Sequence, residues 1–353
     1  MKIKIAILER DKSYLTRIVT AFGTKYADKL EIYSFTDQEI AIQSLAQAKI
    51  DVLLAGDVFD IEVAKLPKRC AFAYLVDSMG IESIKDQQAI CKFQKADLIY
   101  KQILSVYSEK ASSITGFDVT GEKGACIAFC SASGGVGSST MAAACAMHFA
   151  KNGSKVLYLN LERFGSSEAF FEGQGQYDMS DIIFALKSKK TNLHIKLEGC
   201  VKQDLSGVYY YAPTKVALDM MELNVDDKLR LLSEINLMGE YDFVVLDVEF
   251  GLDKDTLKLL RQTQAVVLVG DGSNESNIKT ERAYAALSIL EQNSDAPLTD
   301  RMSFVYNKVS SKSGQSISVS GLKELGGARR YMDANSRQIV EQLAALDLFD
   351  AIL

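Results

Sequence analysis

The chain has 353 residues, a formal net charge of −6 and a hydrophobic fraction of 48%, which suit a globular protein of about two domains with a sizeable core. No apolar run approaches the roughly 18 residues that a membrane-spanning helix needs, and the acidic total gives no general reason to expect nucleic-acid binding. One basic cluster, Lys187, Lys189 and Lys190, is most simply a solvated helix end, with DNA contact as the alternative.

The first 106 residues alternate short apolar runs with helical patterns. Strands are predicted at 4–8, 31–35, 50–56, 71–76 and 96–100. Strands spaced by helical segments predict a parallel sheet with helices on both faces. Residues 107–122 lose this periodicity and are rich in Ser, Thr, Gly and Glu, so we place an interdomain linker there.

A second and larger pattern of the same kind fills residues 123–353. Strands are predicted at 125–130, 155–161, 207–212, 241–247, 265–270 and 302–307, and helices at 140–151, 226–239, 274–292 and 336–353. The sequence therefore predicts an α/β chain with two doubly wound domains, 1–106 and 123–353, the second with a mostly parallel sheet.

The six cysteines lie mostly inside apolar segments. A chain of this length does not need disulfides, so we expect reduced core thiols in a cytoplasmic protein. Cys126 and Cys130 lie four residues apart on one predicted strand face. A metal or redox pair is one interpretation of them, but burial is the simpler one because free cysteine packs as a small hydrophobe. His148 and His194 are isolated and are predicted to be structural.

A glycine-rich loop, SASGGVGSST (131–140), follows the strand at 125–130 and opens the helix at 140–151. Strand, glycine turn and helix are the context of a phosphate-binding loop, whose backbone N–H groups point at an anion. An ordinary Gly/Ser-rich turn is the alternative. The predicted nucleotide contacts are Gly134, Gly135, Val136, Gly137, Ser138, Ser139 and Thr140.

Acidic residues follow two later strands. Asp247 ends the apolar strand YDFVVLD, where a buried carboxylate is costly without a partner such as Mg²⁺. A helix N-cap is the alternative role for Asp247. Asn160 and Glu162 lie two residues apart and share a face, so Glu162 orients water or Mg²⁺ if it points into the site and is a solvated charge if it does not. The candidate catalytic residues are Glu162 and Asp247, and the candidate Mg²⁺ ligands are Ser139 and Asp247.

These three sites, in this order, resemble those of the MinD/ParA superfamily of deviant-Walker ATPases. The loop is similar to the KGGxGKTT pattern, the end of the strand before Glu162 to the D-x-D site, and YDFVVLD to the Walker B strand. Asn307 in VYNK matches a late asparagine that contacts adenine in that superfamily. The resemblance covers 123–353 and implies a P-loop ATPase domain that binds ATP and Mg²⁺ and forms a homodimer.

Within the superfamily, the chain most resembles the CpaE/TadZ branch. GGVGSST is followed by LxxFG (Leu161, Phe164, Gly165), and GVYYYAP (207–213) is similar to that branch's G-x-x-x-x-A-P strand. Members of the branch carry an N-terminal receiver-like (flavodoxin-like) domain, which agrees with the pattern of residues 1–106.

The receiver resemblance extends to single residues. Glu9 and Asp11 take the place of a receiver's acidic Mg²⁺ pocket, and Lys101 in IYKQ matches the receiver lysine. The phosphoacceptor position holds Gly56, and a side chain one residue on, at Asp57, faces the opposite side of a strand. We therefore predict a pseudo-receiver that is not phosphorylated on aspartate.

Both lysines that the superfamily uses in its phosphate loop are replaced here, by Ser133 and Ser138. Each lost lysine weakens ATP binding by roughly ten- to a hundredfold, while hydrolysis loses charge stabilisation that grows in the transition state. We expect a protein that binds ATP and hydrolyses it slowly or not at all. Arg163 is the nearest candidate to replace the lost charge.

The resemblance implies a dimeric ATP-binding scaffold that localises a Tad-type (Tad/Flp) pilus assembly and secretion machinery at the cell pole, with components of that machinery or a polar marker protein as partners. An active ParA- or MinD-like ATPase that positions a cargo is the first alternative, and an interaction module with an empty site is the second. The amphipathic residues 336–353 carry mainly acidic polar residues, so we predict a packing helix rather than a membrane anchor. No direct nucleic-acid contact and no integral membrane segment are expected.

Overall fold

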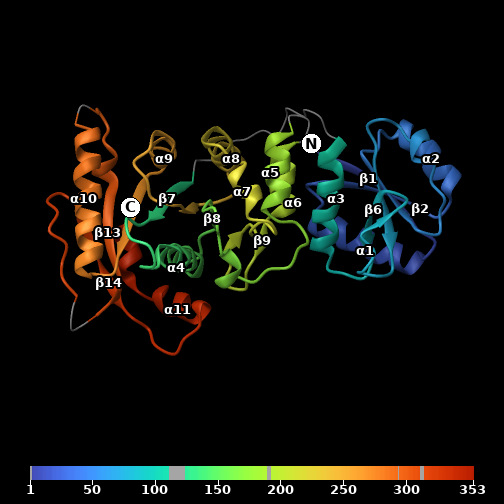
Figure 1. Ribbon diagram of the computed structural model, residues 1–353. Coiled ribbons are helices and arrows are strands. Elements are labelled where there is room, and N and C mark those ends of the chain that lie inside the picture. The colour runs from blue at the N-terminus through green and yellow to red at the C-terminus, as the bar shows by residue number, and fades with distance from the viewer. Residues whose placement is uncertain (1, 111–123, 189–191, 293, 311–313) are drawn as a thin grey trace. The chain divides into compact units, whose positions relative to one another are not determined.

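The computed structural model describes residues 2–110, 124–188, 192–292, 294–310 and 314–353. Contacts divide the chain into two compact units, Met1–Asp118 with Phe184–Cys200, and Val119–Ile183 with Val201–Leu353. Figure 1 draws the elements of both. Residues 111–122 of the predicted linker lie outside the described residues, as do Lys189 and Lys190 of the basic cluster.

The first unit is built on a six-stranded sheet with the order β2-β1-β3-β4-β6-β5, parallel except where β5 pairs with β6. Apolar clusters cover both faces of the sheet, and the central strands β3 and β4 are buried at every position, which is typical of parallel strands inside an α/β fold. The elements in chain order are β1 Ile3–Leu8, α1 Lys12–Lys25, β2 Leu30–Phe35, α2 Gln38–Gln47, β3 Val52–Gly56, η1 Val63–Lys65, β4 Ala71–Val76, β5 Ser83–Ile84, β6 Gln87–Cys91 and α3 Ala96–Lys110.

One predicted strand of this unit is wrong. Residues 96–100 open α3, and the last parallel strand is β6, which the sequence reading missed. The buried residues Ile99, Ile103 and Val106 recur at spacings of three and four, which is the period of a helix. A five-residue apolar run was too short to separate strand from helix.

The first unit also contains α6 (Leu193–Cys200), which the sequence places far beyond α3. Ile195 belongs to the same apolar cluster as α3. The Tyr100 hydroxyl donates to Glu198 Oε1 at 3.1 Å, and the buried Lys196 ammonium donates to Ser105 Oγ at 2.9 Å. A helix from the later half of the chain thus covers part of the receiver-like core.

The second unit is built on an eight-stranded sheet with the order β14-β13-β12-β7-β11-β8-β10-β9, parallel except where β9 pairs with β10. In Figure 1, α4 and α11 lie below these strands, and α8 and α9 lie above them. The elements in chain order are β7 Ala125–Cys130, α4 Ser138–Lys151, β8 Val156–Asn160, η2 Ser167–Ala169, α5 Met179–Lys187, β9 Lys202–Gln203, β10 Tyr209–Tyr210, α7 Leu218–Met221, α8 Val225–Met238, β11 Phe243–Asp247, α9 Lys254–Leu260, β12 Ala265–Gly270, α10 Asn274–Leu290, η3 Leu298–Arg301, β13 Met302–Val309, β14 Lys323–Arg329, α11 Ser336–Leu343 and η4 Asp347–Ala351.

The second unit differs from the sequence reading at its edges. The predicted strand 207–212 shortens to β10, the predicted helix 336–353 divides into α11 and η4, and β14 was not predicted. Within β14 only Ala328 is buried, so this edge strand carries little of the apolar pattern that marks a strand. Pairing with β13, rather than its own hydrophobicity, places it in the sheet.

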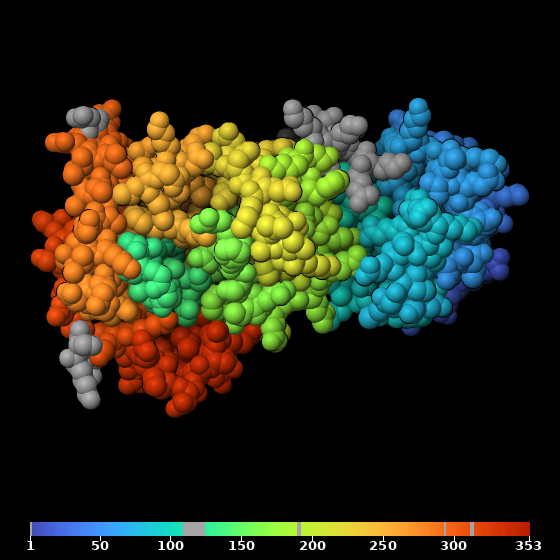
Figure 2. All heavy atoms as spheres, in the orientation of Figure 1, coloured from blue at the N-terminus to red at the C-terminus, as the bar shows by residue number. Residues whose placement is uncertain are grey.

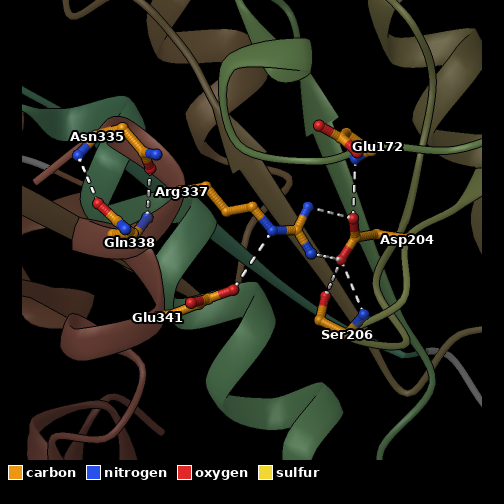
Figure 3. A network of polar contacts seen from close by, with 7 residues as sticks. All are labelled: Glu172, Asp204, Ser206, Asn335, Arg337, Gln338 and Glu341. Atoms are coloured by element: carbon orange, nitrogen blue, oxygen red, sulfur yellow. Dashed lines mark hydrogen bonds and ion pairs between the residues drawn. The ribbon is translucent and has the colours of Figure 1, made fainter.

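The C-terminal helix α11 packs against α4 within the second unit. Val340 and Leu343 are fully buried in the cluster that contains α4. Figure 3 shows a second contact of α11, where the Arg337 guanidinium faces Asp204, the residue directly after β9. Its Nη1 donates to Oδ2 at 2.8 Å and its Nη2 to Oδ1 at 3.2 Å, while the Asp204 side chain is fully buried. In the contact between α11 and α4, His148 Nδ1 lies 3.0 Å from the Ala344 carbonyl oxygen.

All six cysteines are buried and free of disulfides. Burial raises the pKa of Cys126 and of Cys130 to about 12, so both are inert packing thiols at neutral pH. Among the helices of the described residues, none has the length and apolar character that crossing a bilayer requires.

Candidate functional site

The loop between β7 and α4 has the backbone of an anion cradle. Gly137 is the N-cap of α4 and adopts φ +90°, a left-handed conformation that favours glycine. A Cβ at this position would lie 2.5 Å from Asn307 Nδ2, so a larger residue does not fit. The same Asn307 Nδ2 donates to the Val136 carbonyl at 2.9 Å, which ties the loop to β13.

The backbone N–H groups of residues 134–140 are available to a ligand. Within the described part of the chain, none of them donates to a backbone carbonyl or a side chain, and no side chain caps α4. The series runs through all seven predicted contacts, Gly134, Gly135, Val136, Gly137, Ser138, Ser139 and Thr140. Consecutive free N–H groups at a helix N-terminus attract an anion. In Figure 2, green atoms of the segment around α4 reach the surface, bordered by orange atoms from later in the chain.

Asp247, at the end of β11, is completely buried beside this loop's strand. Its Oδ2 accepts from the Tyr158 hydroxyl at 2.6 Å and from Asn160 Nδ2 at 2.7 Å. Its Oδ1 is buried and has no hydrogen-bond partner. An unpartnered carboxylate oxygen is costly in the interior, so this atom is a candidate to bind a ligand.

Glu162 lies in the same group, just past β8. The Ser139 hydroxyl donates to Glu162 Oε2 at 3.2 Å, and the Glu162 N–H donates to Asn160 Oδ1 at 3.0 Å. The structure therefore brings together Ser139 in the first turn of α4, Asn160 and Asp247 at the ends of β8 and β11, and Glu162 just past β8. Tyr158 was missed, although its position two residues before Asn160 places it on the same strand face.

The pKa values of the two carboxyl groups are raised, as expected for acids that are buried close together without a cation. Burial, followed by the charge of Glu162, raises the pKa of Asp247 from 3.8 to about 7. Burial also raises the pKa of Glu162, and Glu249 adds to the effect. No Lys or Arg of the described residues forms an ion pair with either carboxylate. The pKa of both acids is raised, and a divalent cation beside them would favour their ionised forms.

These residues fit Mg²⁺. The donors are a hydroxyl, Ser139, and carboxylate oxygens, Glu162 and Asp247, which are the hard ligands that Mg²⁺ prefers. The described residues contain no group of three or more His, Cys, Asp or Glu side chains arranged to hold a metal by themselves. Mg²⁺ is commonly held by one or two protein ligands together with phosphate oxygens and water, so this donor set suits a nucleotide-bound ion.

Ser133 and Ser138 stand where the superfamily has its loop lysines, and Arg163 does not replace their charge. Its guanidinium pairs with Glu249, with Nη2 at 2.8 Å from Oε2, on the exposed surface. The cation at the loop is instead Lys308, whose Nζ donates to the Gly135 carbonyl at 2.8 Å. The sequence reading missed Lys308, although it directly follows the predicted Asn307.

The corresponding strand ends of the first unit form a different site. The Lys92 ammonium lies 3.1 Å from Glu9 Oε2 and 2.6 Å from Asp77 Oδ1. A Cβ added to Gly56 would approach Glu9 Oε2 at 3.0 Å, so the carboxylate occupies the space that a phosphoacceptor side chain would need. Asp57, one residue on, is exposed, whereas Glu9 is buried.

Two residues predicted for this first site have other places. Lys101 was predicted as the receiver lysine but lies on α3; Lys92, directly after β6, takes that position. The error follows from the strand wrongly predicted at 96–100. Asp11 caps α1, accepting from Ser13 N at 2.8 Å, rather than joining Glu9 as a second pocket ligand.

The first unit thus has the receiver class of α/β fold, and Lys92 forms an ion pair with its buried acidic residue Glu9. The second unit has a nucleotide-binding class of fold, and the N–H groups of residues 134–140 in its glycine loop have no acceptor among the described residues. Residues 1–108 match the model of the family described as "TadZ-like, receiver domain", so this part of the chain is similar to that family's receiver domain, in agreement with the resemblance found in the sequence. No curated protein matches the sequence.

Solved structures identify the fold of the second unit. The chain is similar to a ParA family ATPase from Chlorobium tepidum TLS, with 15% identity, a TM-score of 0.51 and coverage of 65% of this chain and 96% of that one. This likeness shows the fold, which is that of a ParA family ATPase and confirms the predicted fold class. A plasmid partition protein from Borrelia burgdorferi has 17% identity, a TM-score of 0.47 and coverage of 65% and 100%. The MinC:MinD cell division protein complex of Aquifex aeolicus has 15% identity, a TM-score of 0.45 and coverage of 62% and 93%.

Proposed function

We propose that this protein binds ATP with Mg²⁺ in its second unit and uses the bound nucleotide as a slow or non-hydrolysing switch. The observation that carries the proposal is the pairing of the unclaimed N–H groups of residues 134–140 with the orphaned Oδ1 of Asp247. One feature binds an anion and the other binds a cation, and Mg²⁺-ATP presents both. Asn307 remains a proposed contact of the adenine.

Mg²⁺ in this site would be held by the Ser139 hydroxyl and by Asp247, with Glu162 beside them. When bound, it neutralises phosphate charge and polarises the phosphoryl oxygens. The carboxylate of Asp247 stays oriented by Tyr158 and Asn160, so the chain's own residues keep the cation position ready.

Slow turnover follows from what the loop lacks. Serines occupy positions 133 and 138, and Arg163 is engaged with Glu249. Cationic groups that stabilise a transferring phosphoryl group contribute on the order of 10³–10⁵ to the rate when an arginine supplies them. A site without such a group holds nucleotide better than it cleaves it.

For the cellular role, we propose a homodimeric scaffold that localises a Tad-type pilus assembly and secretion machinery at the cell pole. The TadZ-like receiver match at residues 1–108 and the ParA family fold of the second unit support this role together. Components of that machinery or a polar marker protein are the proposed partners. An ATPase that cycles to position a cargo is the competing function, and turnover separates the two.

The test starts with denaturing the purified full-length protein and identifying any released nucleotide, followed by equilibrium binding of Mg²⁺-ATP. We expect bound or bindable ATP in the wild type, weakened at least tenfold in Asp247→Ala and unchanged in Asp295→Ala, an exposed aspartate of the same unit. Wild-type protein that binds no nucleotide would contradict the proposal. Rapid Mg²⁺-dependent turnover that falls in Asp247→Ala would instead favour the cycling ATPase.

A further inference from the structure

Two neighbouring residues of β13 contact the same loop. Asn307 Nδ2 donates to the Val136 carbonyl at 2.9 Å, and Lys308 Nζ donates to the Gly135 carbonyl at 2.8 Å. Successive side chains of a regular strand point to opposite faces of the sheet. Something in the backbone must therefore turn both of them toward the loop.

The cause is an irregularity in β13 at this point. The ladder with β14 shifts register between Tyr306 and Val309. Lys308 has φ +57°, a left-handed conformation that is unusual for a residue other than glycine. Its N–H donates to Asn307 Oδ1 at 3.0 Å, which fixes the bend. Bulges of this kind re-aim side chains beside functional sites, and local strain of this kind persists where the surroundings enforce it.

The two bonds determine how the loop presents its donors. In a planar trans peptide, the C=O of one residue and the N–H of the next point in opposite directions. Lys308 and Asn307 hold the carbonyls of Gly135 and Val136 toward β13. The N–H groups of Val136 and Gly137, on the same two peptides, are therefore held facing away from β13, where no protein acceptor claims them.

The charge of Lys308 strengthens this arrangement. In the described part of the chain, the Lys308 ammonium forms no ion pair, and the Gly135 carbonyl is its one hydrogen-bond acceptor. A hydrogen bond from an ammonium is about twice as strong as a neutral one and polarises the peptide that accepts it. A polarised peptide has a more positive N–H, so the Val136 N–H becomes a better donor to an anion.

We propose that Lys308, supported by Asn307, is a positioning residue that holds the phosphate loop ready for nucleotide, from a strand distant in sequence. It takes over the organising role left open by the serines at 133 and 138. The proposal rests on the proposed function in that the ligand of the loop is the phosphate chain of a nucleotide. Lys308 acts through the loop backbone, already before the nucleotide arrives.

Lys308→Asn is the sharpest variant. Asparagine tolerates the left-handed conformation better than lysine does, so the substitution removes the ammonium while relaxing the backbone. Lys49→Asn is the matched control, because Lys49 also has a left-handed φ, +56°, and is exposed in the first unit. The two variants share the chemical change and the backbone conformation and differ in contact with the loop.

The first measurement is the ¹H–¹⁵N heteronuclear NOE of Val136 and Gly137 in the nucleotide-free, full-length protein. We expect rigid values in the wild type and in Lys49→Asn, and clearly lower values in Lys308→Asn. Equal rigidity in Lys308→Asn would overturn the proposal, because a lysine that only contacts the nucleotide leaves the free loop unchanged.

The second measurement is the dissociation constant of Mg²⁺-ATP. We expect a roughly ten- to a hundredfold weaker complex for Lys308→Asn and no change for Lys49→Asn. Unchanged or tighter binding by Lys308→Asn would overturn the proposal. Wild-type protein that binds no nucleotide would contradict the proposed function alone, since the NOE measurement still tests whether Lys308 orders the loop.

Discussion

Both units place a buried carboxylate at the carboxyl end of a parallel sheet, and they treat it in opposite ways. In the receiver-like unit, Glu9 is paired with Lys92, and the Glu9 carboxylate takes the space that a side chain at Gly56 would need. In the ParA-like unit, Asp247 and Glu162 have no cation among the described residues, and one oxygen of Asp247 has no partner. The carboxylate of the first site is paired within the chain, whereas one oxygen of the second site has no hydrogen-bond partner and is where we propose that a ligand binds.

The two units show that the same position at a sheet edge serves stability when its carboxylate is paired and is available for binding when it is not. A buried charge must be paired, because its desolvation costs several kcal/mol. Pairing the charge with a residue of the same chain, as at Glu9, stabilises the fold and leaves no carboxylate oxygen for a cation to bind in its place. Leaving it unpaired, as at Asp247, should weaken the ligand-free fold and, under the proposed function, favour the binding of Mg²⁺. Substitutions at the two sites should therefore change stability with opposite signs.

The largest expected effect is on the paired carboxylate of the first unit. Lys92→Ala leaves Glu9 buried without its cation and should lower the free energy of unfolding of the first unit by about 3 kcal/mol. Urea unfolding monitored by hydrogen exchange in β1 measures this unit selectively. Lys95→Ala, at an exposed lysine three residues away, should change little, and Glu9→Gln in the Lys92→Ala background should restore most of the loss. Similar effects of Lys92→Ala and Lys95→Ala would remove the distinction between the sites.

The next effect has the opposite sign. Asp247→Asn removes a buried charge while keeping an oxygen for Tyr158 and Asn160, and should stabilise the nucleotide-free protein by about 1–3 kcal/mol. It should also abolish the rise in melting temperature that Mg²⁺-ATP gives the wild type. Asp295→Asn, on the surface, serves as the control. A destabilised Asp247→Asn protein would show that the carboxylate is satisfied without a ligand.

The same carboxylate predicts a pH dependence. Because the pKa of Asp247 is raised from 3.8 to about 7, the folded protein binds this proton more tightly than the unfolded chain does. This group's contribution to stability is therefore fully favourable below pH 4 and is lost as the pH rises toward 7. The wild-type minus Asp247→Asn difference in unfolding free energy, measured across this range without nucleotide, should follow that slope; a flat difference would contradict the raised pKa.

The smallest expected effect is none at all. Incubating the protein with acetyl phosphate should add no phosphoryl group by intact mass spectrometry, because Gly56 replaces the acceptor and Asp57 is an exposed residue beyond the end of β3. An adduct that disappears in Asp57→Ala would show that the first site remains a working receiver.

Features with a strong local pattern could be read from the sequence. Strands β3, β4 and β12 are continuous apolar runs, and the glycine loop before α4 carries its own signature. Segments with weak patterns were predicted wrongly or not predicted. The start of α3 looks like a strand over five residues, and its misassignment moved the expected receiver lysine from Lys92 to Lys101.

The sequence alone determined two α/β units, and it predicted the glycine loop, Glu162 and Asp247 as site residues because strand ends of a parallel sheet meet at one edge. Tertiary structure alone decided that α6 belongs to the first unit, that Lys92 forms the ion pair with Glu9 and that Lys308 donates to the glycine loop. The position of α6 depends on packing between distant segments, that of Lys92 on where β6 ends and α3 begins, and that of Lys308 on the irregularity in β13. None of these has a periodic signal, because each arises from how separate segments pack together.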